Sequence, residues 1–150
     1  MNRKISEGGF NLVELVVVIT ILGIIAAFAV PRFAALEAQA RLAATQALAG
    51  SIRSGAALSH ALWVAQGDPS STNLTMEGEA ITMTNGYPDA ASIAATLVEY
   101  VGFSLTTASG TAVFTKQSSS GSAMANCFVR YAPPASADSA PTVTATTGGC

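Results

Sequence analysis

Glu14 is the residue whose type and position point most directly to chemistry, because it is the only ionisable side chain in an apolar run from Phe10 to Val30. A carboxylate inside hydrocarbon costs on the order of 2.5 to 3.5 kcal/mol, so it usually has a function and a partner. A simpler interpretation is a tolerated polar residue that reaches back to the lipid headgroups, since Glu14 lies near the start of the run. The identity of the partner decides between these interpretations.

A positive partner for Glu14 arises if the chain is cut between Gly9 and Phe10. Such a cut creates an α-ammonium on Phe10, which lies four residues before Glu14 and therefore on the same helical face. Burial of both charges is tolerable when they pair, whether the ammonium belongs to the same chain or to a neighbouring copy. The pair would link proteolytic processing to assembly.

The sequence predicts no catalytic site, cofactor site or metal site, and therefore no enzyme. The single histidine, His60, lacks partners nearby in sequence, which favours an ordinary helix contact over a catalytic or metal role. A calcium site formed by Glu77, Glu79 and Asp89 is an alternative, although these residues show no ligand loop of regular spacing. The net charge of −2 gives no support for nucleic acid as a partner.

Cys127 and Cys150 are the two cysteines of the chain, and they allow one intramolecular disulfide. An apolar segment ahead of them indicates export to an oxidising compartment, where such a bond persists. The alternative is a pair of free thiols. A zinc site is disfavoured because zinc requires about four ligands and the histidine is far away in sequence.

The run from Phe10 to Val30 contains 21 residues, which as a helix would measure about 31 Å and match the bilayer core. Arg3 and Lys4 precede the run and favour a cytoplasmic N-terminus. A cleaved secretory signal ending at Ala29 is the alternative, but the run exceeds the 7 to 15 residues typical of a signal core.

Helical spacing continues beyond the run. Gly23 and Pro31 weaken the helix, and we expect it to kink or open at Pro31 because proline removes a backbone donor. An apolar stripe then follows at steps of three or four residues, and the helix is predicted over Phe10–Gln66 with its stop at Gly67-Asp68-Pro69. The stripe consists of Phe33, Leu36, Ala40, Ala44, Leu48, Ile52, Gly55, Leu58 and Leu62.

The rest of the chain predicts turns and short strands, so the fold class is α+β. We expect an antiparallel sheet to pack on the outer half of the helix and to cover the stripe from Leu48 to Leu62. A short helix is predicted over Ala90–Tyr100, and loops at Asn85–Pro88 and Ser118–Gly121. The predicted strands are Ala80–Thr84, Phe103–Thr106, Thr111–Lys116, Cys127–Tyr131 and Thr142–Thr146.

Gly8-Gly9-Phe10, with Glu14 four residues further on and an apolar run ending in Pro31, resembles the prepilin-peptidase site of type IV pilins and the related secretion pseudopilins. The resemblance implies the pilin fold, with a leader at residues 1–9, a transmembrane and polymerisation helix at 10–30, its amphipathic continuation at 31–66 and a β-rich head at 67–150. It also implies N-methylation of Phe10. One departure is Asn11, where the family usually has Thr.

The C-terminal half resembles one branch of that family, the mannose-sensitive haemagglutinin (MSHA) pilins. The resemblance rests on Gly86-Tyr87-Pro88, on Cys127-Phe128-Val129-Arg130-Tyr131 and on the end from Thr146 to Cys150. It implies a pilus subunit for surface attachment and biofilm formation in a Gram-negative bacterium. The implied partners are other copies in a helical filament, the peptidase, the inner membrane with its assembly machinery, and surface glycans.

Two other functions stay open at this stage. A pseudopilin of type II secretion would share the cut but leave no long surface fibre. A secreted binding module released after Ala29 would instead begin at Val30.

Overall fold

The computed structural model of the chain describes residues 9–67 and 72–150. The first eight residues of the expected leader, with Arg3, Lys4 and Gly8, lie outside the described residues, as do Asp68 and Pro69 of the expected helix stop. The chain divides into two compact units, Met1–Ala38 and Gln39–Cys150.

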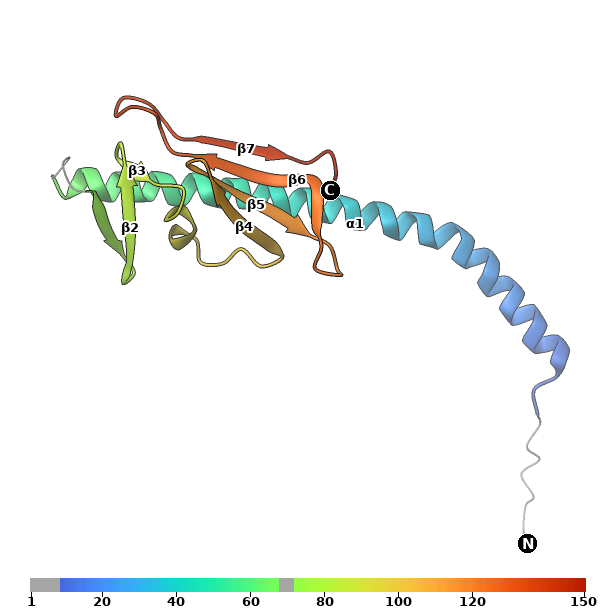
Figure 1. The fold of residues 1–150 in the computed structure, drawn as a ribbon. Helices are drawn as coiled ribbons and strands as arrows, with labels where there is room; N and C mark the ends of the chain where they lie inside the picture. The colour runs from blue at the N-terminus through green and yellow to red at the C-terminus, as the bar shows by residue number, and fades with distance from the viewer. Residues whose placement is uncertain (1–8, 68–71) are drawn as a thin grey trace, which may run out of the picture. The chain divides into compact units, whose positions relative to one another are not determined.

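The helix α1 (Leu12–Ala65) contains 54 residues and begins and ends within two residues of the prediction (Figure 1). Its helical backbone continues through Gly23 and Pro31, so the helix does not open at Pro31. A kink at these two residues stays a prediction. After α1, Gly67 adopts a φ of 67°, the left-handed conformation that commonly ends a helix and that glycine adopts without strain.

Two antiparallel sheets follow in the second unit (Figure 1). The smaller sheet has the order β1-β2-β3, and the larger has the order β4-β5-β6-β7. The smaller sheet consists of β1 (Asn73–Met76), β2 (Glu79–Thr84) and β3 (Tyr87–Pro88). The larger sheet consists of β4 (Phe103–Ala108), β5 (Thr111–Gln117), β6 (Ala123–Ala132) and β7 (Thr142–Thr146).

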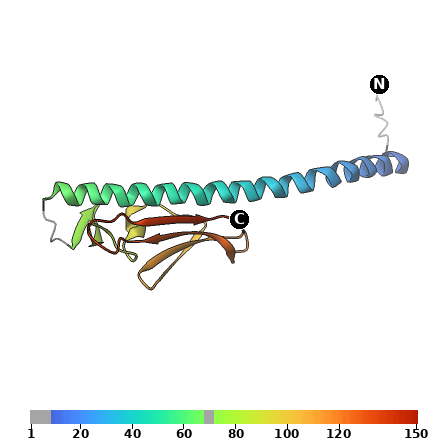
Figure 2. The same cartoon turned by 90° about the horizontal axis from the view of Figure 1, so that it is seen from above.

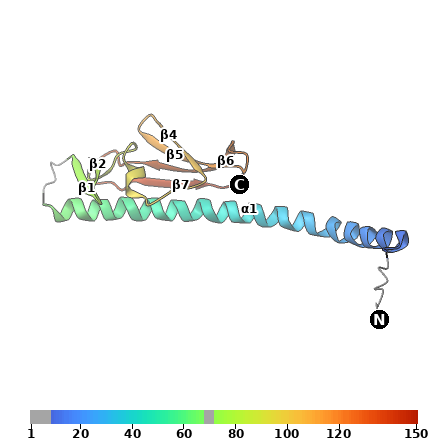
Figure 3. The same cartoon turned by 90° about the horizontal axis from the view of Figure 1, so that it is seen from below.

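Within the second unit, the strands lie on one side of α1, as Figures 2 and 3 show from opposite directions. The α+β class with a long N-terminal helix packed against antiparallel sheet is therefore confirmed. The inward faces of β5 and β6 follow the two-residue period of a strand, because Phe114 pairs with Val129 and Ala112 pairs with Tyr131, and all four are buried.

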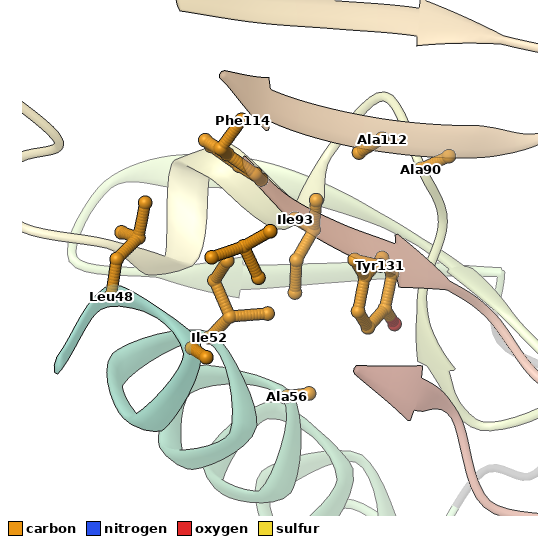
Figure 4. Packing of buried hydrophobic residues seen from close by; sticks show 10 residues of the cluster. Leu48, Ile52, Ala56, Ala90, Ile93, Ala112, Phe114 and Tyr131 are labelled. Carbon is orange, nitrogen blue, oxygen red and sulfur yellow. The ribbon is translucent and has the colours of Figure 1, made fainter. Parts of the chain in front are cut away.

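The main core lies between α1 and the larger sheet. Figure 4 shows Leu48 and Ile52 of α1 facing Phe114 of β5 and Tyr131 of β6, with Ile93 between them. Each of these side chains is buried, and burial of such a residue contributes about 1.5 to 3 kcal/mol. The part of α1 that belongs to the second unit and the larger sheet thus share one core.

The buried face of α1 is rotated from the predicted stripe. Leu48 and Ile52 are buried as predicted, but Leu58 is exposed, and the buried face includes Thr45 and Ser59 instead. Both hydroxyls donate to the carbonyl oxygen four residues earlier, at 2.9 Å each, so their burial leaves no polar group unpaired. An apolar pattern could not reveal this face, because two of its members are polar.

Other details of the second unit also differ from the prediction. Only Ile93–Thr96 of the expected helix over Ala90–Tyr100 is helical, as the 3₁₀ helix η1, because the backbone of Leu97 is already extended. Strands β1 and β3 were not expected. Tyr87 and Pro88, predicted as loop, form β3 after a tight turn in which Asn85 and Gly86 both have positive φ.

Candidate processing and assembly site

The bond between Gly9 and Phe10 lies just ahead of α1. Neither residue is helical, and the side chain of Phe10 is 84% exposed. A Cβ built on Gly9 would meet nothing within 4 Å. Within the described residues, this segment is therefore open to an enzyme that must bind an extended chain.

A capping box starts α1. The carboxylate Oε2 of Glu14 accepts a hydrogen bond from the backbone N–H of Asn11 at 3.0 Å. The side-chain oxygen of Asn11 accepts in turn from the backbone N–H of Val13 at 3.3 Å. Two amides that lack helical partners are thus satisfied reciprocally. Asn11, which departs from the family pattern, serves well here because Asn and Thr are both good N-cap residues.

The capping box also places the carboxylate near the expected new terminus. Glu14 already reaches back to the amide of Asn11, which is the residue directly after Phe10. If the chain is cut before Phe10, the α-ammonium forms one residue further back on the same backbone. The carboxylate therefore needs only a small adjustment to approach this charge, and the negative group also suits the positive end of the helix.

The apolar run of α1 is uncovered in the first unit. The helix contains a window long and apolar enough to span a bilayer, and none of that window is buried within the structure. The hydroxyl of Thr20 donates to the carbonyl oxygen of Val16 at 2.7 Å, so this polar group needs no water. Such a surface requires lipid or protein around it.

The two cysteines of the chain are joined, as predicted. Cys127 and Cys150 form a disulfide with a Cα–Cα distance of 4.9 Å, which confirms the predicted bond. The bond lies against α1, because the hydroxyl of Thr45 is 3.5 Å from the sulfur of Cys127 and 3.6 Å from that of Cys150. Arg41 Nε donates to the carbonyl oxygen of Cys150. The end of the chain is thereby fixed beside the helix (Figure 1).

Sequence reasoning missed Thr45 and Arg41 as partners of the disulfide, since both are remote in sequence and no local pattern marks them. It also missed the capping role of Asn11. A signal for that role was present, because an Asn followed three residues later by Glu is the sequence pattern of a capping box.

The chain resembles a known pilus component over part of its length. Over 50 residues it is 50% identical to the type IV narrow pilus major component PilA5 of Thermus thermophilus, which covers 33% of this chain and 43% of that protein. This partial similarity supports a type IV pilin. No protein-family model matches the chain, and no solved structure matches it.

The other candidate residues belong to the second unit. His60 stacks on Tyr87 with ring centroids 4.2 Å apart, and its Nδ1 lies 2.7 Å from the carbonyl oxygen of Gly86. This geometry fits a structural contact between α1 and β3. Among residues 9–67 and 72–150, no three His, Cys, Asp or Glu side chains gather as a metal site would require. Asp89 instead accepts from the backbone N–H of Ser92 at 2.7 Å.

Proposed function

We propose that this chain is the structural subunit of a type IV pilus. A prepilin peptidase cuts between Gly9 and Phe10, and the exposed helix then leaves the membrane to pack among copies of itself in a helical filament. The protein acts as a building block and not as an enzyme. The partial similarity to a pilus component supports this role.

The observation that carries the proposal is the start of α1. An exposed, non-helical Gly9-Phe10 leads into a helix with no buried residue in its apolar window. The one carboxylate of that run, on Glu14, is directed back toward the cut by its bond to Asn11. A charge pair with the new α-ammonium of Phe10 would make burial in a filament tolerable, because neither charge is then left alone in an apolar surrounding.

The finer parts of the proposal rest on the family resemblance. They are N-methylation of Phe10 after the cut, insertion of the precursor in the inner membrane of a Gram-negative bacterium, and delivery to the pilus assembly machinery. In the manner of the MSHA pilins, the filament would attach cells to surfaces, with glycans as one class of receptor, and would initiate biofilms.

The test begins with shearing of cells that express the chain. We expect filaments whose subunit begins at Phe10 by N-terminal sequencing, with a mass that includes one methyl group. The variant Glu14→Leu should be cut but should yield no filaments. A mature chain that starts at any other residue would refute the proposal.

Glu14→Gln separates the two roles of this residue. Glutamine also completes a capping box, so the helix start is preserved while the negative charge is lost. If charge pairing drives assembly, Glu14→Gln should fail to form filaments as Glu14→Leu does. Normal filaments from Glu14→Gln would show that capping alone is needed and would remove the charge pair from the proposal.

The same measurements address the two alternatives. A type II secretion pseudopilin would give the Phe10 terminus without long fibres in the sheared fraction. A secreted binding module would appear free in the medium with Val30 as its first residue.

A further inference from the structure

The second unit carries an apolar surface beside α1 that its own sheets leave uncovered. Among the described residues of this unit, every exposed large hydrophobic side chain lies either on α1 or in the segment from Val98 to Val101. Val98 is 100% exposed and Val101 is 79% exposed. Val98 lines a groove together with exposed Leu58 of α1, and exposed apolar side chains that adjoin one another mark an interaction surface.

Three grooves adjoin these side chains and together form what we call the α1 groove. The largest has a volume of about 780 Å³ and lies between α1, at Gly55 and Leu58, and the segment Thr96–Glu99. A second groove shares Leu58 and Val98 with the first, and a third contains Val101. Most residues that α1 contributes to the first groove are glycine or serine, and their small size allows another chain to approach closely.

The charge of the α1 groove has one sign. Glu77 and Glu79 line one part and Glu99 lines two parts, and among the described residues no lysine or arginine lines any of the three. A partner with an apolar surface and a positive charge would therefore complement the groove, because like charges across an interface are unfavourable and opposite charges fix its register.

The first unit presents a segment with these properties. Phe28, Arg32 and Leu36 are four residues apart, so they share one face of α1. Phe28 is 75% exposed and Leu36 is 58% exposed. Arg32 is exposed as well, and it is the only basic residue of the described part of this unit.

We propose that the α1 groove receives the Phe28–Leu36 face of a second copy of this chain, with Arg32 of that copy against Glu99. The inference rests on the proposed function and deepens it, because it names a contact between copies besides the packing of the apolar run. The apolar side chains exclude water from the contact, and the charge pair sets which residues meet.

Charge reversal tests the inference in filaments sheared from cells. Glu99→Arg alone and Arg32→Glu alone should each lower the filament yield by about tenfold or more, the change expected from a lost favourable contact. The double variant should restore most of the yield, since the two charges then meet with reversed signs. Asp138→Arg is the control, because Asp138 is an exposed acid that does not line the groove.

A photo-crosslinking residue at Val98 tests the contact directly in intact filaments. We expect crosslinked dimers whose joined peptide includes residues 28–36 of another copy. The same residue at Val64, which is exposed but does not line the groove, should not give this product. Crosslinks from Val98 only to lipid or to a different protein would overturn the inference.

The outcomes separate the inference from the function on which it rests. If the wild-type chain forms no filaments, the proposed pilus role is wrong and the inference is wrong with it. If wild-type filaments form and Glu99→Arg filaments are equally abundant, the pilus role stands and the inference alone is overturned.

Discussion

The carboxylate of Glu14 is bound to the backbone of Asn11 in the uncut chain. This hydrogen bond gives the acidic side chain a partner at the start of an apolar helix. It lowers the cost of burial, because an ionised group that accepts a hydrogen bond keeps part of its solvation. The same carboxylate is then in position for the ammonium that a cut would create at Phe10.

Gly55 shows how a single residue determines the packing of α1. A Cβ at this position would lie 2.4 Å from Oγ1 of Thr96 and 3.2 Å from the backbone oxygen of Thr96. We therefore expect Gly55→Ala to lower the free energy of unfolding by about 1 to 3 kcal/mol, the usual cost of overpacking. Urea denaturation of the detergent-solubilised chain, followed by near-ultraviolet circular dichroism, measures this change.

Gly50 supplies a matched control for that prediction. It lies on the same helix, but a Cβ there would meet nothing within 4 Å. Gly50→Ala should leave stability unchanged or raise it by up to about 1 kcal/mol, since alanine is the better helix former. Equal effects of the two substitutions would contradict the close contact between α1 and η1.

The two sheets and α1 are joined by a few specific contacts between elements. The ring of His60 on α1 stacks on the ring of Tyr87 on β3. Gly86 lies close to α1 as well, because a Cβ at this position would be 2.9 Å from the ring of Trp63. The hydroxyl of Tyr131 on β6 donates to the carbonyl oxygen of Pro88 on β3 at 2.6 Å. The smaller sheet is thereby tied to the helix and to the larger sheet.

Tyr131 makes stability depend on pH in the alkaline range. Burial raises the pKa of Tyr131 well above its ordinary value, and the nearby charge of Asp89 adds to this effect. The unfolded tyrosine ionises near pH 10 while the folded one stays neutral. Its contribution to the free energy of unfolding is therefore fully present below about pH 10 and is lost as the pH rises further. Urea denaturation between about pH 8 and 11 measures this decline.

Tyr131→Phe isolates the contribution of that hydroxyl. The variant should be less stable at neutral pH by about 1 to 3 kcal/mol, because the buried carbonyl of Pro88 loses its donor. It should also decline less steeply above pH 10 than the wild-type chain. Parallel pH profiles for the two proteins would show that ionisation of Tyr131 does not control the alkaline loss.

The whole molecule combines a first unit whose apolar helix is uncovered with a second unit that has its own hydrophobic core. Gln39–Cys150 is compact, contains the two buried clusters and holds the disulfide. We predict that residues 39–150, exported to an oxidising compartment, fold as a soluble protein without the first unit. Cooperative urea unfolding and a monomeric mass by sedimentation would verify this, whereas an aggregated or non-cooperative product would contradict it.

The disulfide between Cys127 and Cys150 should contribute to the stability of that fragment. Replacement of both Cys127 and Cys150 by serine should lower the free energy of unfolding by about 3 to 4 kcal/mol, because the bond closes a loop with a sequence separation of 23 residues. Addition of a reductant should destabilise the wild-type fragment by a similar amount and should leave the serine variant unchanged.

The amino-acid sequence by itself determined the features that follow from local pattern and length. The apolar run and the stripe at steps of three or four residues predicted the long helix, and short stretches with β-branched or aromatic residues located all four strands of the larger sheet. The two cysteines predicted the disulfide because only one intramolecular pairing exists. These inferences need no knowledge of which distant residues meet.

Tertiary structure alone decided what depends on contacts between remote segments. It placed polar Thr45 and Ser59 on the buried face of α1 and left Leu58 exposed, since each hydroxyl is satisfied within its own helix. It also brought Glu99 and Val98 beside α1 to form the groove. No periodicity encodes such a surface, because its residues come from two segments that are remote in sequence, α1 and Thr96–Glu99.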